Sequence, residues 1–406
     1  MATEVVEVEG HIVDSLILAK VLDAIVDAGA DYRMAEVEIG RTNLDPSRAR
    51  LEITAADEDA LSRLLADLKV HGANKVDQPD ATVVPAEVDG VLPAGFAATT
   101  NLPTAVRLSG RWVEVENPEM DCALVVLPDG RVRTVPMHRV RAANLVVVGE
   151  DGVRVRPLDR PRGSSPFEFM SSDVSSEKPK EVVVARLAER IRAARAAGGK
   201  VLAVCGPAVV HTGAAPALAA LVRDGWVDVL FAGNGFATHD IEANVAGTSL
   251  GIPLSGDTPS EGGHSNHLRA INEVRRRGSI AAAVADGWLT GGVMFECVSR
   301  GVPFVLGGSV RDDGPLPDVI TDVVAAADAM RDLVPGVAVA LMLASTLHAI
   351  ATGNLLPAGV ETYCVDINQA VVTKLADRGS HQALGIVTDV GLFVETLAAA
   401  LARPTP

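Results

Sequence analysis

The sequence lacks a basic tract. Its 406 residues carry a formal net charge of -16 at pH 7, and no stretch rich in lysine and arginine is interleaved with aromatic residues. Proteins that bind nucleic acid need such positive charge, so the composition argues against a nucleic-acid partner. We therefore expect a small-molecule ligand, with Arg311 and Lys374 as the cations nearest to the polar clusters described below.

Cysteines are few, and their spacing forms no metal or disulfide pattern. Cys122, Cys205, Cys297 and Cys364 are far apart and include no Cys-x-x-Cys pair. This spacing argues against a zinc site or a disulfide framework, and we expect no metal. Small buried thiols are typical of a reduced, cytoplasmic protein, and the cytoplasm is the location that we expect.

The sequence also lacks a secretory signal and a long apolar run. Met1 to Gly10 is acidic and contains no extended apolar core. The most apolar later stretch, Val337 to Gly353, is interrupted by a serine, a threonine and a histidine and is short for a membrane span. We therefore expect no membrane partner.

The length of the chain suggests two or three domains. Over residues 1–105, strand and helix patterns alternate in the order βαββαβ, which is typical of a ferredoxin-like α+β module. Asp57 is the expected N-cap of the second helix. The expected strands are 3–9, 34–39, 51–53 and 81–87, and the expected helices are 16–25 and 58–68.

Residues 106–160 are expected to form a small β subdomain. The pairs Asp129-Gly130 and Asp151-Gly152 favour tight hairpins, because glycine tolerates positive φ. Residues 161–180, with several prolines and serines, are expected to form an extended connector. The expected strands of the subdomain are 111–115, 122–127, 131–135, 145–148 and 153–156.

From residue 181 to residue 406, apolar runs alternate with helical stretches, which predicts an α/β domain with a parallel sheet of at least six strands. Ligands of open α/β sheets bind beyond the carboxyl ends of the strands, where helix N-termini favour anions. Three late runs end abruptly in polar clusters, and these clusters predict a nucleotide-type site. The clusters are Ser345-Thr346-Leu347-His348, Asp366-Ile367-Asn368 and Thr388-Asp389-Val390, and the remaining strands are expected at 200–205, 227–231 and 303–306.

This domain lacks the Gly-x-Gly-x-x-Gly fingerprint of dinucleotide-binding folds. Its first strand leads instead into Gly206–Gly213, a turn that either holds a phosphate or substrate or is an ordinary tight turn. Asn234 and Gly235 end the next strand, where small residues allow a ligand to approach the backbone closely. Asp240 follows as a polar candidate, with a helix cap as the alternative.

Histidines and one dense polar loop provide further candidates. His264 and His267 make a weak metal pattern, and the alternatives are proton transfer near neutral pH or a structural role. The loop 307–318 contains three glycines, Arg311 and carboxylates including Asp312, which suits a zwitterionic substrate or a ribose. At the end of a later strand, the Asp366 carboxylate would accept hydrogen bonds from a ribose diol and disfavour a 2′-phosphate. We therefore expect NAD rather than NADP.

Eight segments distributed along the chain form a specific combination: 119–122, 167–172, 206–213, 239–242, 262–268, 311–322, 364–368 and 371–377. Together they resemble the archaeal-type, NAD-dependent ornithine cyclodeaminases, over roughly residues 8–400. The N-terminal region is similar to the LOR/SDH bifunctional enzyme conserved region, and the C-terminal region to cyanobacterial arginine dihydrolase/ornithine cyclodeaminase fusions. The resemblance implies a nucleotide-binding domain similar to that of deoxyhypusine synthase, a Rossmann variant without the glycine fingerprint.

The resemblance implies conversion of L-ornithine to L-proline and ammonia, a reaction of arginine and ornithine metabolism and of proline biosynthesis. Hydride passes from the substrate to bound NAD and back, so NADH does not accumulate. We expect Arg311 to bind the carboxylate, Asp312 or Asp240 to bind the amines, and His264 or His267 to transfer protons. The cofactor positions implied are Asn234, Gly235, Asp312, Ser345, Thr346, Leu347, His348, Asp366, Asp389 and Val390.

Two rival interpretations have distinct biochemical signatures. Another NAD-dependent amino-acid or imino-acid oxidoreductase, such as a saccharopine-type dehydrogenase, would accumulate NADH. A non-catalytic NAD or amino-acid sensor, suggested by the ferredoxin-like module, would bind its ligand without turnover. The apolar composition and the N-terminal module also suggest a homo-oligomer.

Overall fold

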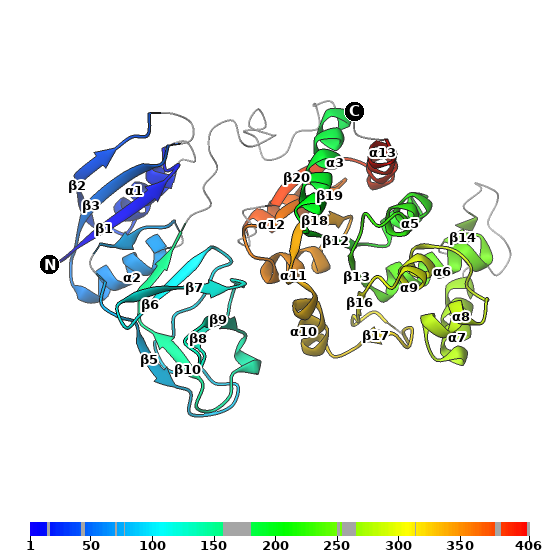
Figure 1. Cartoon of the computed structure of the whole chain (residues 1–406), viewed down its shortest axis with the longest axis horizontal. Coiled ribbons are helices and arrows are strands. Elements are labelled where there is room, and N and C mark those ends of the chain that lie inside the picture. The colour runs from blue at the N-terminus through cyan, green and yellow to red at the C-terminus, as the bar shows by residue number, and fades with distance from the viewer. Residues whose placement is uncertain are drawn as a thin grey trace. The chain divides into compact units, whose positions relative to one another are not determined.

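The chain divides into two compact units, which Figure 1 shows with their helices and strands labelled. Unit 1 comprises Met1–Phe169 and Leu356–Gly359, and unit 2 comprises Met170–Leu355 and Val360–Pro406. A computed structural model describes residues 1–13, 17–41, 45–69, 71–76, 78–156, 180–249, 252–253, 265–312, 314–377 and 383–403. His264 and residues 161–179 of the predicted connector lie outside these ranges. Within them, no helix is both long and apolar enough to cross a membrane.

The first sheet of unit 1 has the predicted ferredoxin-like arrangement. Its elements are β1 (Ala2–Gly10), α1 (Ile17–Asp27), β2 (Asp31–Glu38), β3 (Ser47–Ala55), α2 (Glu58–Lys69) and β4 (Asn74–Lys75). The strands are antiparallel in the order β2-β3-β1-β4, and both helices pack on the same apolar core. Every second residue of β3 is buried, which is the period of a strand with one face on a core. The predicted N-cap is confirmed, because Asp57 accepts a hydrogen bond from the Ala60 amide (2.8 Å).

The strand predicted at residues 81–87 does not close this sheet. The closing strand is β4, a two-residue strand in which Lys75 pairs with Val6. β5 (Thr82–Pro85) pairs instead with β10 (Leu145–Val148) in the second sheet. The apolar pattern of residues 81–87 identified a strand, but tertiary contacts select the partner of a strand, and a polar dipeptide such as β4 carries no strand pattern.

The second sheet of unit 1 is a mostly antiparallel sheet of seven strands. Besides β5 and β10 it contains β6 (Thr104–Leu108), β7 (Arg111–Glu116), β8 (Ala123–Val126), β9 (Val132–Val135) and β11 (Val153–Val155), with a 3₁₀ turn, η1 (Met137–Arg139). The order is β11-β6-β7-β9-β8-β10-β5, and β7 and β9 pair in parallel. Each strand predicted for the subdomain is present, whereas β6 was not predicted.

The two glycine turns of this sheet have different roles. Asp129-Gly130 joins β8 and β9, which form the predicted antiparallel pair. The hairpin predicted at Asp151-Gly152 is wrong, because β10 pairs with β5 and β8 whereas β11 pairs with β6. A Cβ atom at Gly152 would lie 2.3 Å from the Ala81 amide nitrogen. Glycine is therefore required at this turn by a close backbone contact and not by a hairpin.

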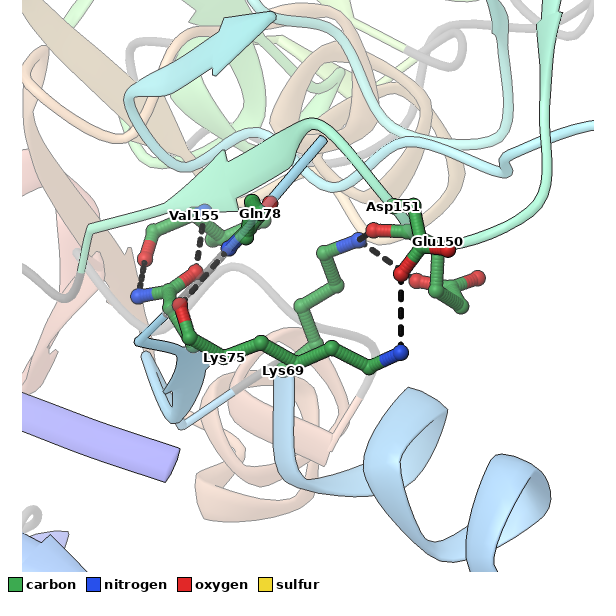
Figure 2. Close-up of polar contacts among 7 residues, drawn as sticks. Lys69, Lys75, Gln78, Glu150, Asp151 and Val155 are labelled. Carbon is green, nitrogen blue, oxygen red and sulfur yellow. Dashed lines mark hydrogen bonds and ion pairs between the residues drawn. The ribbon is translucent and has the colours of Figure 1, made fainter. Parts of the chain in front are cut away.

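Polar contacts join the two sheets of unit 1 (Figure 2). The Asn74 side chain donates to the Val155 carbonyl (2.8 Å) and accepts from the Val155 amide (2.9 Å). The Lys69 ammonium donates to the Glu150 carboxylate (2.5 Å), although burial lowers the pKa of Lys69. Because buried polar groups are costly unless they are paired, these contacts hold the sheets in one arrangement.

Unit 2 contains the predicted parallel sheet. Its strands are β12 (Lys200–Cys205), β13 (Val229–Gly233), β16 (Phe304–Gly307), β17 (Val319–Ile320), β18 (Val337–Leu343), β19 (Glu361–Asp366) and β20 (Ala383–Val387), with a small pair formed by β14 (Thr248–Ser249) and β15 (Ile252–Pro253). Its helices are α3 (Lys180–Ala196), α4 (Ala208–His211), α5 (Ala215–Arg223), α6 (Asn234–Ala246), α7 (Asn266–Arg277), α8 (Ile280–Ala285), α9 (Val293–Arg300), α10 (Val323–Leu333), α11 (Leu347–Leu355), α12 (Gln369–Asp377) and α13 (Val390–Ala402). Helices α3, α5, α9 and α13 pack together in one layer, and α10, α11 and α12 in another.

The strand order identifies a doubly wound Rossmann topology. The sheet has the order β17-β16-β13-β12-β18-β19-β20, and its paired strands are parallel. Without the short β17, and counted along the chain, this is the order 3-2-1-4-5-6. The order reverses between β12 and β18, and ligands of such sheets bind at the carboxyl ends beside this switch point. The predicted fold class is confirmed, although the glycine fingerprint is absent.

Candidate active site

The switch point is formed by two backbone segments in very close contact. The Gly206 amide, directly after β12, donates to the Leu343 carbonyl at the end of β18 (2.9 Å). A Cβ atom at Gly206 would lie only 1.8 Å from the Ala344 carbonyl oxygen. Ala344 itself has a φ of 47°, a left-handed conformation that costs a non-glycine residue about 1–3 kcal/mol. A strained backbone conformation of this kind persists only where the surrounding structure holds it in place, and such conformations are frequent at ligand sites.

The turn after β18 has the features of an anion-binding turn. Ser345 is buried and Leu347, the first residue of α11, is exposed. The free amides at the start of a helix attract phosphate groups, and serine and threonine hydroxyls add donors. Predicted cofactor positions 345–348 therefore lie together at the switch point, as the polar cluster indicated.

His348 lies against the carboxyl ends of β13 and β16. A Cβ atom at Gly233 would be 2.9 Å from its Cε1 atom, and one at Gly307 would be 3.1 Å from its Nε2 atom. Burial lowers the pKa of His348, while the negative charge of Asp312 opposes this shift. The imidazole is therefore favoured in its neutral form, and the two glycines leave the space that it occupies.

Asn234 ties the loop after β16 to the start of α6. Its side chain is nearly buried, accepts a hydrogen bond from the Leu316 amide (3.0 Å) and donates to the Asp312 carboxylate (3.4 Å). The other Asp312 oxygen accepts from the Ser309 amide (2.8 Å). Gly235 lies beside the Pro207 ring, and a Cβ atom at Gly235 would be 3.3 Å from the ring Cγ atom. The predicted residues Asn234 and Asp312 thus form one hydrogen-bonded group.

The carboxyl ends of β19 and β20 hold the remaining predicted cofactor residues. Asp366 accepts from the Asn368 amide (2.8 Å), and Asp389 caps α13 by accepting from the Leu392 amide (2.9 Å). Val390 is the first, buried residue of that helix. The buried Thr388 hydroxyl has no hydrogen-bond partner among the described residues.

The residues at this edge fit NAD. Asp366 follows Ser345 by 21 positions, at the end of the next strand, which is the spacing of a turn that holds pyrophosphate and a carboxylate that holds a ribose. The unpaired Thr388 hydroxyl provides a further polar group for a ligand. The half of the sheet from β18 to β20 thus contains, in chain order, the turn and the carboxylate that are expected of a mononucleotide-binding unit.

Asp240 is fully buried and binds the start of a helix. Its two oxygens accept from the amides of Val293 (2.9 Å) and Met294 (2.8 Å), the first residues of α9. Burial raises its pKa to about 6, while these two hydrogen bonds act in the opposite direction. A Cβ atom at Gly292 would lie 2.8 Å from its carboxylate. The contacts match the helix-cap alternative for Asp240, and none of them joins it to the predicted cofactor residues.

The other predicted catalytic residues lie in different surroundings. Arg311 is exposed, and its amide donates to the Ser309 hydroxyl (3.2 Å). His264 lies outside the described residues, whereas His267 is half-buried in the first turn of α7. Within the described ranges, no group of three or more His, Cys, Asp or Glu is arranged to hold a metal ion. The four cysteines are free and buried.

Three residues that were not predicted as site residues form a group with His267. The rings of His211 and His239 meet edge to face at 4.9 Å, and the rings of His239 and His267 are 6.0 Å apart. Glu242, on α6, is fully buried and lies 2.9 Å from the Nδ1 atom of His239. In the sequence, His239 and Glu242 are three positions apart in a helical stretch, so their side chains can meet on one face of the helix. This spacing is common on helices, and it identifies no function until the residues packed around the pair are known.

Three family models match consecutive parts of the chain. Residues 3–102 match the LOR/SDH bifunctional enzyme conserved region. Residues 103–184 match the first region of the C-terminal part of ArgZ-like arginine dihydrolases, and residues 185–397 match the Rossmann fold of that part. Together the models cover nearly the whole chain.

Similar proteins and structures extend over the same length. The ornithine cyclodeaminase of Methanopyrus kandleri is 51% identical over 98% of this chain and 97% of its own. The crystal structure of a LOR/SDH protein from Methanococcus maripaludis, 45% identical, covers 80% of this chain and 98% of its own with a TM-score of 0.76. The ternary complex of AgrE with ornithine and NAD+, from a Nostoc bifunctional arginine dihydrolase/ornithine cyclodeaminase, is 40% identical over 98% of this chain and 57% of its own, with a TM-score of 0.54. This chain therefore belongs to the family of the archaeal ornithine cyclodeaminases, which also includes the matching part of the cyanobacterial bifunctional enzymes.

Proposed function

We propose that this chain is an NAD-dependent ornithine cyclodeaminase, which converts L-ornithine to L-proline and ammonia. The observation that carries the proposal is its identity of 44–52% with five archaeal ornithine cyclodeaminases over almost its full length. The AgrE complex, which contains ornithine and NAD+, supports the same substrate and cofactor.

The cofactor is proposed to bind across the switch point of unit 2. Positions 345–348 would hold the pyrophosphate, Asp366 the adenosine ribose, and Asp389 and Val390 the neighbouring part of the nucleotide. Asn234, Gly235 and Asp312 would border the other half of the cofactor. When bound, NAD accepts a hydride from the substrate and returns it within one turnover.

The protein's own groups would bind the amino acid and move its protons. We propose that Arg311 binds the carboxylate and that Asp312, rather than the deeply buried Asp240, faces an amine. His264 and His267 are the sequence-based candidates for proton transfer. Exposure of Arg311 supports a role in capturing the substrate, because a guanidinium binds a carboxylate through two parallel hydrogen bonds.

Location and self-association are further parts of the proposal. Four free, buried thiols are consistent with a cytoplasmic protein. A homo-oligomer is supported by the edge strand β2, on or directly after which Met34, Val37 and Ile39 are exposed. Light scattering coupled to size-exclusion chromatography measures the oligomeric state directly.

The decisive experiment incubates the purified protein with L-ornithine and NAD+ and measures proline, ammonia and NADH together. Equal amounts of proline and ammonia, with no lasting NADH, are expected for the cyclodeaminase. Accumulation of NADH with an amino or imino acid would support a saccharopine-type dehydrogenase instead. Binding of NAD+ or ornithine in calorimetry without any product would support a sensor.

A further inference from the structure

Three imidazoles meet beyond the carboxyl ends of β12 and β13. His211 stands six positions after the last residue of β12, and His239 stands six positions after the last residue of β13. The centroids of these two rings are 4.9 Å apart. The ring of His267, on α7, has its centroid 6.0 Å from that of His239. His239 is therefore the central ring of the cluster, at the edge of the sheet where Rossmann domains bind their ligands.

A buried carboxylate orients the central ring. The Glu242 Oε2 atom lies 2.9 Å from Nδ1 of His239, one helical turn away. Its other oxygen accepts from the Thr248 hydroxyl (2.8 Å), which in turn accepts from the Asn266 side-chain amide (3.0 Å). An ionised carboxylate is only an acceptor, so Nδ1 of His239 carries the proton and Nε2 presents a lone pair. The contact fixes the orientation of the ring.

Exposure increases stepwise across the cluster. Glu242 is 0% exposed and His239 is 9% exposed, whereas His211 is at the surface. The Nδ1 atom of His211 lies 2.6 Å from the Ser249 hydroxyl. The cluster therefore leads from a buried carboxylate to solvent, which is the arrangement that a proton-exchange path requires.

The cluster also contains a buried nitrogen without a partner. Nδ1 of His267 has no hydrogen-bond partner among the described residues. An unpaired buried polar group costs about 1–3 kcal/mol, so this nitrogen calls for a partner that the described residues do not supply. Burial lowers the pKa of His211, and the nearby His239 lowers it further. A positive charge on His211 is therefore disfavoured.

We propose that His239, positioned by Glu242, is the acid–base group of the cyclodeaminase site, with His211 exchanging its proton with solvent. The proposal rests on the proposed function. After the hydride transfer of the proposed activity, Cα is bonded to its nitrogen as an imine. Nε2 of His239 removes one proton from the side-chain ammonium of ornithine, the freed lone pair forms the ring bond to Cα, and the π electrons of the imine move to the α-nitrogen, which takes the proton from His239. His239 then moves a second proton from the ring nitrogen to the α-nitrogen, and the lone pair left on the ring nitrogen forms a new C=N bond as the bond from Cα to the α-nitrogen breaks and ammonia leaves. Two protons thus pass from one nitrogen to the other, and the cyclic imine takes back the hydride.

The titratable groups that face His239 among the described residues are Glu242 on its own helix, His211 on α4 and His267 on α7. The nearby strand β14 contributes the hydroxyls of Thr248 and Ser249. Glu242→Gln is therefore expected to loosen the orientation of the His239 ring, because the carboxylate that binds Nδ1 is replaced by an amide.

Three variants test the proposal: Glu242→Gln, His239→Asn and His267→Asn. Glu273→Gln is the matched control, because Glu273 pairs with Arg277 on α7, the helix that also carries His267. Each protein is examined by the pH profile of kcat/KM with ornithine and NAD+, by NAD+ affinity, and by NMR titration of labelled histidines without substrate or cofactor.

In E242Q we expect kcat to fall about 10- to 100-fold and the pH profile of kcat/KM to change, together with the NMR resonances of the His239 ring. In H239N we expect kcat to fall about 100- to 10,000-fold. NAD+ affinity should persist in both variants, and E273Q should behave as the wild type.

Two results would overturn the proposal: H239N that retains the wild-type kcat, or E242Q in which neither the kinetic profile nor the His239 resonance shifts. If E242Q fails to fold, H239N decides alone, by losing or keeping turnover while binding NAD+. If H267N loses all turnover while H239N keeps the wild-type kcat, the acid–base group is His267 instead of His239. A wild-type protein that makes no proline contradicts the proposed function itself, which is a different outcome from any of these.

Discussion

The contact between Gly206 and Ala344 predicts a large effect of one methyl group. In Gly206→Ala, the new Cβ atom would be 1.8 Å from the Ala344 carbonyl oxygen, and ordinary contact begins near 3.4 Å. The oxygen must therefore move by about 1.6 Å, the difference between these two distances. A shift of that size breaks the hydrogen bond from the Gly206 amide to the Leu343 carbonyl.

The cost can be worked out from these two changes. A buried backbone group that loses its partner costs about 1–3 kcal/mol, and overpacking costs about 1–3 kcal/mol more. We therefore expect G206A to lower the free energy of unfolding by about 4 kcal/mol, which lowers the Tm of unit 2 by roughly 8–16 °C. Because Ser345 and the start of α11 follow Ala344 directly, NAD+ affinity should fall as well.

Thermal unfolding by circular dichroism and NAD+ titration by fluorescence measure the two effects. Gly213→Ala is the matched control, since Gly213 ends the same turn, has a φ of 83° and has no atom within 4 Å of its Cβ position. G213A should lower the free energy of unfolding by only about 1 kcal/mol, the cost of a positive φ in a residue that has a Cβ atom. If G206A has the same Tm as G213A and binds NAD+ like the wild type, the contact between Gly206 and Ala344 does not constrain the backbone at the switch point.

Unit 2 supports four further predictions. Ala344→Gly should raise the free energy of unfolding by about 1 kcal/mol in urea denaturation, because glycine adopts a φ of 47° without strain; an unchanged midpoint would contradict this. Asp366→Ala should weaken NAD+ binding about 10- to 100-fold in calorimetry, since a charge-assisted hydrogen bond to the ribose is lost; equal affinity would place the ribose elsewhere. Arg311→Ala should raise KM for ornithine about 10- to 100-fold without changing NAD+ affinity; steady-state kinetics at saturating NAD+ provide the test. The pKa of Asp240 is raised from 3.8 to about 6, so the folded chain binds more protons between these values, and this contribution to stability is full below pH 3.8 and lost as pH rises through 6. Relative to Asp240→Asn, the wild type should therefore lose about 2 kcal/mol of unfolding free energy between pH 4 and pH 7, as measured by urea denaturation, and parallel pH curves would refute the assignment.

The parallel sheet was predictable because its strands are buried on both faces. Val337–Leu343 and 200–205 therefore read as continuous apolar runs, and the change to polar residues marks the candidate ligand-binding edge. This change indicated the polar clusters after three late strands, and the resemblance to known enzymes implied the full set of cofactor positions. By contrast, β4 has two polar residues, and β6 lies in a stretch with no distinct pattern, so neither was predicted.

Side-chain roles were less predictable than strand positions. The sequence made Asp240 a candidate for binding the amines, with a helix cap as the alternative, whereas Glu242 was not among the predicted site residues. The structure makes the first a cap for α9 and the second the partner of His239. The difference depends on which elements pack against each face of α6, and no local pattern contains that information.

By itself, the sequence determined the fold class, the edge of the sheet that carries the candidate ligand-binding residues and, through its resemblance to known enzymes, the expected reaction. Those properties depend on local periodicity and on motifs, which a single segment of chain contains. Only the tertiary structure decided that Gly206 and Ala344 are in contact and that β5 belongs to the second sheet. It also decided that the rings of three histidines lie close together beside a buried glutamate. Contacts between distant segments arise from the packing of whole elements, and it is this packing that turns His239 from one histidine among nine into the central member of a cluster.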